Sequence, residues 1–310
     1  MSTINQAQVL AWGSPPTYTT APPPPATGPD EVRLTLKATA LHRVVRSRAA
    51  GTHYSSTTLP HVPGIDGVGT TEDGKTVYFA SMSVGAMSEV LNVPKRSVCE
   101  VPEGLDPVKA AALVNPAMSS WMGMKARTSA GTVREGFGVL ILGVTSASGR
   151  LAVPLARTLG AGRVVGAARS EKGMEGLGLD GAVVLAEKAE ETDWSAVGEV
   201  DVILDYIGGP AAASALAAIP TPRVVDYVHI GSLSGSLDVT VPGAVLRSKN
   251  IVIRGSGPGA WETREVLGEM PAMLEAIRGA GEQPMRVVEL SEVEREWVRE
   301  GTGERVVFVP

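Results

Sequence analysis

The residues best suited to chemistry form a turn bounded by glycines, between a predicted strand and a predicted helix. Val139–Leu142 is an apolar strand candidate, and residues 143–149 follow it with the sequence GVTSASG. Backbone N–H groups and the positive end of a following helix can bind a pyrophosphate at such a turn. A helix N-cap at Ser146 or Ser148 would explain the same residues without a ligand. The residues that we expect to bind the pyrophosphate are Ser146, Ala147, Ser148 and Gly149.

Two cations mark the end of the next predicted strand. Arg163–Ala168 is apolar, and Arg169 and Lys172 follow it. An NAD site usually has an acidic residue about 20 residues after the glycine turn, where it accepts a hydrogen bond from the ribose 2′-hydroxyl. A cation in that place suits a 2′-phosphate instead. We therefore predict NADPH as the cofactor, and an ordinary surface role for both cations is the alternative.

From residue 139 onward, the predicted elements that must position these residues alternate between strands and helices. Apolar strand candidates are separated by helical stretches, which is typical of a doubly wound parallel sheet of the α/β class. Residues 1–100 are predicted to be mostly β and irregular. Two helices are predicted after them, at residues 106–113 and 115–127. Ligands bind at the carboxyl ends of parallel strands. The residues that we expect at this edge, where turn chemistry is the alternative, are Tyr206, Ile230, Gly231 and Ser232.

Composition argues against several classes of function. The 310 residues carry 28 basic and 33 acidic side chains, and the net charge of −5 argues against general binding of nucleic acid or an anionic membrane. The N-terminal segment has no signal-peptide pattern, and no run approaches the roughly 18 apolar residues of a membrane span. Cys99 is the only cysteine, so no intrachain disulfide can form and a reducing, cytoplasmic location is expected.

Several motifs occur together in a characteristic order. They include EVRLTLKATALHR, LPHVPGIDGVG, AAALVNPAMSSW, VLILGVTSASGR, VDVILDYIGG and the ending RVVFVP. On these motifs, nearly the whole chain resembles the zinc-independent medium-chain dehydrogenases/reductases of the quinone oxidoreductase type. The resemblance implies a Rossmann domain inserted into a GroES-like, partly barrel-like β domain, with cofactor and substrate in the cleft. We place the GroES-like domain at residues 1–115 and 259–310, and the NADPH-binding domain at residues 116–258.

The resemblance also implies roles for residues outside the glycine turn. The family's helix entry, which here contains Asn115 and Ser119, reaches the nicotinamide end of the cofactor, and Gly255 and Ser256 match residues that flank the carboxamide. Helix capping and turn chemistry are the alternatives. Family members often dimerise through the strand that matches NIVIR, residues 250–254. Because an uncovered edge strand invites pairing, we expect a homodimer.

The chain departs from the zinc-binding members of the same superfamily. It has one cysteine where a structural zinc needs four, and Gly64-Ile65-Asp66 stands where those proteins have Gly-His-Glu. We therefore expect no metal; a site assembled from His42, His53, His61 and Asp66 is the alternative. Two departures from closer relatives are that Ser146 replaces the middle glycine of the turn and His42 replaces an asparagine.

Tyr54 and His42 are the candidate catalytic residues. A tyrosine of the matching loop often lies near the nicotinamide in this family, and a phenol or imidazole there can hydrogen-bond a substrate carbonyl and supply a proton. Loop packing and helix capping are the alternatives. The resemblance implies an NADPH-dependent reductase that passes a hydride to a small-molecule quinone or α,β-unsaturated carbonyl. The alternative, to which the replacement by His42 points, is an NADPH-binding sensor or assembly partner with little turnover.

Overall fold

The computed structural model describes residues 3–53, 55–299 and 304–310. The chain divides into two compact units, residues 1–115 with 270–310 (unit 1) and residues 116–269 (unit 2). We expected the second boundary between residues 258 and 259, before the long C-terminal helix. The first part of that helix, α6 (Thr263–Gly279), belongs to unit 2, where Glu269 accepts a hydrogen bond from Trp121 at 2.8 Å and lies 3.5 Å from the Lys125 ammonium.

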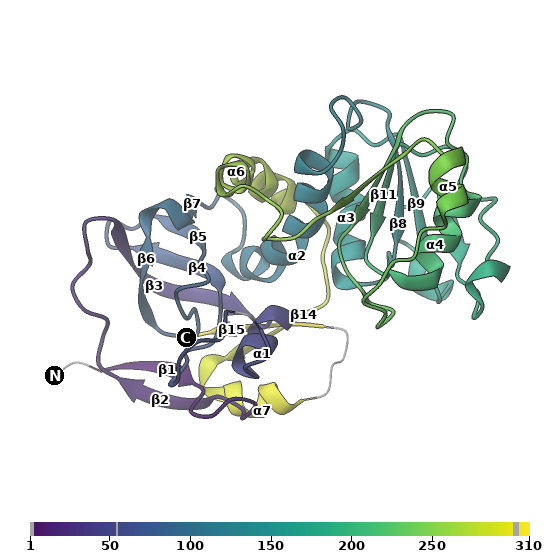
Figure 1. Cartoon of the computed structure of the whole chain (residues 1–310). Coiled ribbons are helices and arrows are strands. Elements are labelled where there is room, and N and C mark those ends of the chain that lie inside the picture. The colour runs from purple at the N-terminus through teal and green to yellow at the C-terminus, as the bar shows by residue number, and fades with distance from the viewer. Residues whose placement is uncertain (1–2, 54, 300–303) are drawn as a thin grey trace. The chain divides into compact units, whose positions relative to one another are not determined.

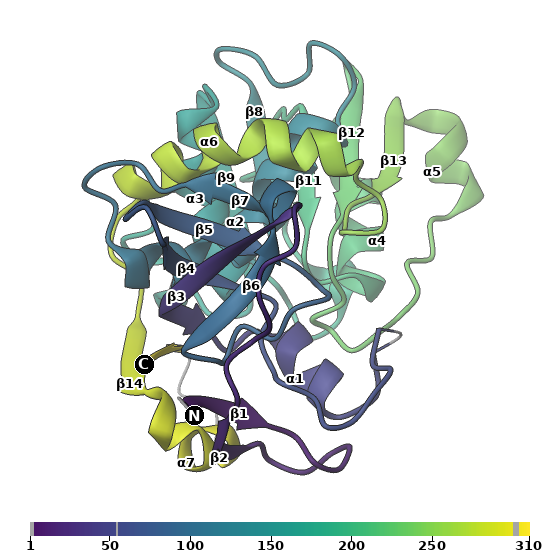
Figure 2. The same ribbon diagram turned by 90° about the vertical axis from the view of Figure 1, so that its left-hand side faces the viewer.

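Unit 1 is built around mostly antiparallel strands. Its seven-stranded sheet has the order β14-β15-β3-β4-β5-β7, and β6 also pairs with β3. Figure 2 shows β3 between β4 and β6. A separate hairpin joins β1 to β2. The elements are β1 (Ile4–Gln8), β2 (Thr17–Ala21), β3 (Glu31–Ala40), α1 (Arg43–Ala49), β4 (Asp66–Thr71), β5 (Thr76–Ala80), β6 (Val90–Pro94), η1 (Lys95–Ser97), β7 (Val98–Glu100), β14 (Met285–Glu289), η4 (Leu290–Glu292), α7 (Val293–Val298) and β15 (Arg305–Val309).

Unit 2 contains a six-stranded parallel sheet, which confirms the predicted doubly wound fold. The strand order is β10-β9-β8-β11-β12-β13, so the winding direction reverses between β8 and β11. In Figure 1 this sheet lies between α2 and α3 on one side and α4 and α5 on the other. The elements are α2 (Pro107–Ala126, which begins in unit 1), β8 (Gly138–Leu142), α3 (Ala147–Thr158), β9 (Arg163–Ala168), η2 (Lys172–Met174), β10 (Gly181–Val184), η3 (Ala189–Glu191), β11 (Val202–Asp205), α4 (Gly209–Ala218), β12 (Val225–His229), α5 (Gly243–Ser248) and β13 (Ile251–Gly255).

Burial on both faces explains why the central strands are continuous apolar runs. Every residue of β8 is buried, and Leu140 and Leu142 pack with Ala212 and Leu216 of α4. The opposite face meets α2, where a Cβ on Gly123 would lie 3.5–3.6 Å from side chains of β11 and β12. Because its strands are parallel, the sheet places their carboxyl ends along one edge. Within the described part of the chain, no helix has the length and apolar character needed to cross a membrane.

Candidate functional site

The glycine turn positions the N-terminus of α3 for a ligand. Gly143 has a φ of +88°, and a Cβ on Gly149 would lie 2.3 Å from the Gly143 carbonyl oxygen, so this close approach requires glycine. Ser146 caps the helix, because its Oγ accepts from the Gly149 N–H at 3.1 Å, and its own N–H donates to Gly143 at 3.0 Å. The N–H groups of Ala147 and Ser148 have no acceptor among the described residues. Of the four predicted residues, these two therefore have backbone donors to offer an anion.

Arg169 and Lys172 are exposed beyond the carboxyl end of β9. Neither side chain forms a hydrogen bond or an ion pair with another described residue. At the start of the same strand, by contrast, the Arg163 guanidinium donates to the Ala196 carbonyl at 2.8 Å. Unpaired cations at the end of β9 suit a phosphate group.

Tyr206 follows the last residue of β11, and its side chain hydrogen-bonds to α2. Its ring is 3% exposed, and its hydroxyl lies 2.5 Å from Ser120 Oγ. Burial raises the pKa of this phenol to about 12, so it stays neutral. The Ser120 hydroxyl also lies 3.4 Å from the Ser148 carbonyl oxygen, at the N-terminus of α3. A cofactor contact by Tyr206 would therefore involve its backbone or ring edge, because its hydroxyl is already engaged.

Asn115 and Ser119 lie inside a continuous helix. The sequence predicted two helices in this region, but α2 runs from Pro107 to Ala126 and includes Pro116. The alternative of N-capping is therefore wrong for both residues. Ser119 Oγ instead donates to the Pro116 carbonyl of the preceding turn at 2.7 Å.

A buried aspartate organises the end of β11. Asp205 is fully buried, and its Oδ1 accepts from the N–H groups of Ile207 and Gly208, both at 2.9 Å. Its Oδ2 accepts from the Tyr227 hydroxyl at 2.5 Å and lies 3.0 Å from His229 Nδ1. Our sequence reasoning missed Asp205. An acidic residue that ends an apolar strand was the signal that could have revealed it.

Asp205 also holds the residues that follow β12. Its backbone carbonyl accepts from the N–H groups of Ile230 and Gly231 at 2.8 and 3.1 Å. Ser232 lies next in the same turn, where its carbonyl accepts from the Gly235 N–H at 3.0 Å. The structure therefore brings these three predicted residues close to Tyr206.

Gly255 ends β13 and Ser256 follows it, beside His229. The Ser256 N–H donates to the His229 carbonyl at 2.8 Å, and its Oγ accepts from Trp261 Nε1 at 3.0 Å. The Gly255 carbonyl accepts from the Arg127 guanidinium at 2.9 Å. The predicted residues after β11, β12 and β13 thus lie along one edge of the sheet.

His42 lies in unit 1, within a buried polar network. Its ring is 3% exposed, Nε2 lies 3.2 Å from Asp66 Oδ1, and Nδ1 lies 3.3 Å from Arg305 Nη1. Tyr78 donates to Asp66 Oδ2 at 2.8 Å, and burial beside Asp66 raises the pKa of this phenol well above its ordinary value. Because arginine has no acceptor, His42 Nδ1 must accept and its proton is assigned to Nε2, facing Asp66. Nδ1 is therefore engaged by Arg305, whereas Nε2 lies close to Asp66 without forming a hydrogen bond with a described residue.

The other candidate catalytic residue, Tyr54, lies outside the described residues. Among the residues that are described, no three His, Cys, Asp or Glu side chains come together in a way that could hold a metal ion.

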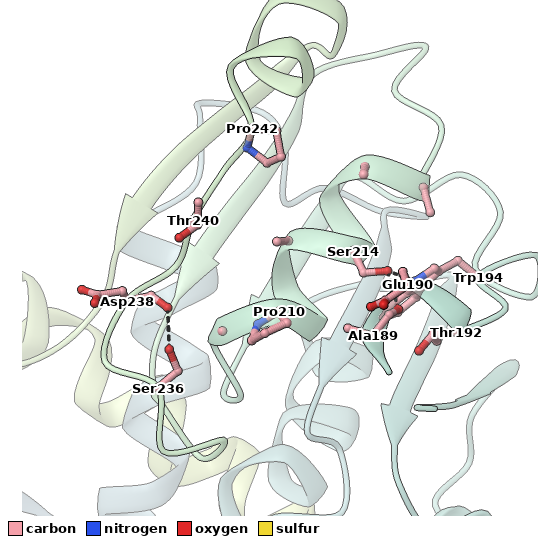
Figure 3. A pocket seen from close by; sticks show the side chains of 14 residues that line it. Ala189, Glu190, Thr192, Trp194, Pro210, Ser214, Ser236, Asp238, Thr240 and Pro242 are labelled. Carbon is pink, nitrogen blue, oxygen red and sulfur yellow. Dashed lines mark hydrogen bonds between the residues drawn. The ribbon is translucent and has the colours of Figure 1, made fainter. Parts of the chain in front are cut away.

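A separate hollow of about 870 Å³ lies along α4 of unit 2. In Figure 3, Trp194 and Glu190 lie on one side of this helix, and Asp238 and Thr240 lie on the other. Trp194 Nε1 donates to Ser214 Oγ at 3.0 Å. None of the predicted site residues lines the hollow, so it carries no part of the site described above.

Comparisons with known proteins bear on the family and the fold of this chain. No family model matches the chain. A probable NADPH-dependent quinone reductase of Emericella nidulans, tdiC, is 37% identical over an alignment of 364 positions, gaps included, that covers 99% of this chain and 100% of the relative. A mycobacterial quinone oxidoreductase structure superposes with a TM-score of 0.82 at 19% identity, over 99% of this chain and 100% of that one. The quinone oxidoreductase of Thermus thermophilus, solved alone and with NADPH, gives a TM-score of 0.75 at 23% identity over the same shares. The structural likenesses confirm the expected fold.

Proposed function

Because the chain belongs to the quinone oxidoreductase type of the zinc-independent medium-chain dehydrogenase/reductase family, we propose that it reduces a quinone or an α,β-unsaturated carbonyl without a metal. It is an NADPH-dependent reductase. The observation that carries the proposal is the site at the carboxyl edge of the parallel sheet. Two open N–H groups, those of Ala147 and Ser148, occur there with the unpaired cations Arg169 and Lys172.

The residues of unit 2 fit a dinucleotide that carries a 2′-phosphate. The open N–H groups would bind the pyrophosphate, and the two cations would bind the 2′-phosphate. Because the strand order reverses between β8 and β11, a dinucleotide lying across that point extends toward the ends of β11, β12 and β13. We therefore assign the nicotinamide half to the residues after β12 and β13, which are Ile230, Gly231, Ser232, Gly255 and Ser256. As the family resemblance implies, Tyr206 would border the adenosine, and Asn115 and Ser119 of α2 would reach the nicotinamide end.

The chain's own residues would align the reactants and stabilise the developing charge. NADPH, when bound, supplies the hydride. Negative charge then grows on the substrate carbonyl oxygen, and a preorganised donor must face it. We assign that donor to Tyr54 or His42. His42 would act only after its contact with Asp66 or Arg305 opens, because these two side chains face its ring nitrogens inside unit 1.

The test is NADPH oxidation followed at 340 nm with a panel of quinones and enals. Turnover with at least one class, lost when NADH replaces NADPH, is the expected result. Binding of NADPH without turnover across the whole panel would contradict the proposal.

That contrary outcome would favour a second function, an NADPH-binding sensor or assembly partner. One observation supports this alternative: the residue that replaces the usual asparagine, His42, is held inside unit 1 by Asp66 and Arg305. The same panel separates the two functions, because a sensor would bind NADPH without oxidising it.

We also propose that the protein is a cytoplasmic homodimer. The single cysteine supports a reducing location. β13 is the last strand of its sheet and Ile253 is 43% exposed, which supports pairing of this edge with a second copy.

A further inference from the structure

Arg150, on the first turn of α3, connects two turns that are far apart in the sequence. Its Nε donates to the Thr145 carbonyl at 3.0 Å, within the glycine turn. One of its terminal nitrogens, Nη2, donates to the Gly173 carbonyl at 3.4 Å, immediately after Lys172. A single guanidinium therefore bridges the turn that offers N–H groups to the pyrophosphate and the turn that carries a cation for the 2′-phosphate.

The two bridged turns are also in direct contact. A Cβ on Gly173 would lie 3.1 Å from Thr145 Cγ2 and 3.2 Å from Ser170 Oγ, so a larger residue would push the turns apart. Ser170 Oγ accepts from the Gly173 N–H at 3.0 Å and fixes the second turn locally. The backbone next to Lys172 is therefore tied to the glycine turn by packing and by the Arg150 side chain.

The charge of Arg150 is not neutralised by the groups that it binds. Both of its acceptors are neutral carbonyls, and no carboxylate of the described residues lies within ion-pair distance of it. By contrast, Arg157 on the same helix is paired with Asp180 at 2.6 Å. The two turns thus carry three cations that form no ion pair with a described residue, which are Arg150, Arg169 and Lys172.

We propose that Arg150 determines the preference for NADPH, by clamping the turn of Lys172 onto the glycine turn and adding a third positive charge beside the 2′-phosphate. This inference rests on the proposed function only through the assignment of the cofactor site. The clamp needs the planar, two-pronged donor of an arginine, which a lysine cannot reproduce. Arg150 is therefore a positioning residue for the cofactor.

The test uses two fragments that bind the adenosine half alone, adenosine 2′,5′-bisphosphate and AMP, with affinities measured by calorimetry. Wild type is expected to prefer the bisphosphate. In Arg150→Gln, the bisphosphate should lose about tenfold more affinity than AMP, the size of one charge-assisted contact. Arg150→Lys should recover only part of that loss. Arg157→Gln is the matched control on the same helix and should keep the wild-type ratio, and circular dichroism checks that each variant folds.

Three results would overturn the inference: an unchanged ratio in Arg150→Gln, an equal loss for both fragments, or full recovery of the ratio in Arg150→Lys. A wild type with no preference for the bisphosphate would instead contradict the cofactor assignment itself, and the inference with it.

Discussion

Asp205 and His229 end two neighbouring parallel strands and meet at 3.0 Å, from Oδ2 to Nδ1. The carboxylate is fully buried, whereas the imidazole is 30% exposed. Because an ionised carboxylate only accepts, Nδ1 carries a proton. In the part of the chain that is described, Nε2 of His229 has no hydrogen-bond partner, so the imidazole is anchored on one side only.

The first prediction concerns pH. The hydrogen bond from Asp205 raises the pKa of His229 above its ordinary value of 6.5. A raised folded-state pKa adds stability that is fully present below the unfolded-state pKa and is lost as the pH rises through the folded-state pKa. His229→Asn, which keeps a donor but cannot be charged, should therefore lower the free energy of unfolding by on the order of 1 kcal/mol at pH 5.5 and by much less at pH 9. Urea titrations at both pH values check this, and an equal effect at both would contradict it.

The second prediction concerns cofactor selectivity. Arg169→Ala should weaken NADPH binding by about 1.5–3 kcal/mol, the usual range for a hydrogen bond to a charged group, and leave NADH nearly unchanged. Nicotinamide fluorescence titration gives both affinities. Arg247→Ala, which removes an exposed arginine from α5 of the same unit, is the control. A wild type that binds NADH as tightly as NADPH would show that the cations after β9 do not select the cofactor.

The third prediction concerns the donor at the substrate carbonyl. Tyr54→Phe removes only a hydroxyl, and His42→Ala removes the imidazole. If either group is the primary donor, its loss should lower kcat by roughly 10²-fold, with NADPH affinity little changed. Steady-state kinetics and NADPH titration measure the two quantities, and wild-type kcat and kcat/KM in both variants would refute the assignment.

A stability measurement separates the two roles that His42 can have. Because His42 lies 3.2 Å from the fully buried Asp66, its removal leaves that carboxylate short of a partner, at a cost of about 1–3 kcal/mol. His42→Ala should therefore unfold at lower urea than Tyr54→Phe. If kcat falls only in proportion to the loss of folded protein, the role of His42 is structural.

The fourth prediction concerns metal. The chain has one cysteine, and its described residues hold no cluster of metal-binding side chains. Elemental analysis of the purified protein should therefore find far less than one zinc per chain, and a chelator should leave the activity intact. Activity that chelation abolishes and zinc restores would disprove metal-free reduction.

The fifth prediction concerns assembly. Pairing of two β13 edges should give a particle of twice the chain mass of 32.1 kDa in light scattering at micromolar concentration. Ile253→Lys places a charge on that edge and should shift the mass toward the monomer, whereas Leu237→Lys, at an exposed loop position, should not. A wild-type mass near that of one chain would rule the dimer out.

Local pattern predicted most of the elements that carry the proposed cofactor site. β9 has the predicted bounds, because it is a short apolar run between turn residues. β14 was not predicted, since its sequence MRVVE has no clear alternation and its partner is the distant β15. The merging of two predicted helices into α2 was also missed, because Pro116 reads as a break when its surroundings are unknown.

The sequence by itself determined the class of fold, the glycine turn and the cations that follow β9, because each of these depends on residues close together in the chain. The tertiary structure alone decided which polar groups meet. Arg150 reaches a carbonyl 23 residues away, Asp205 a histidine 24 residues away, and His42 an arginine 263 residues away. Such hydrogen bonds depend on strand register and on how helices pack against the sheet, and periodicity in a sequence contains neither. For the same reason the sequence nominated His42 as a donor, and only the structure revealed that Asp66 and Arg305 face its two ring nitrogens.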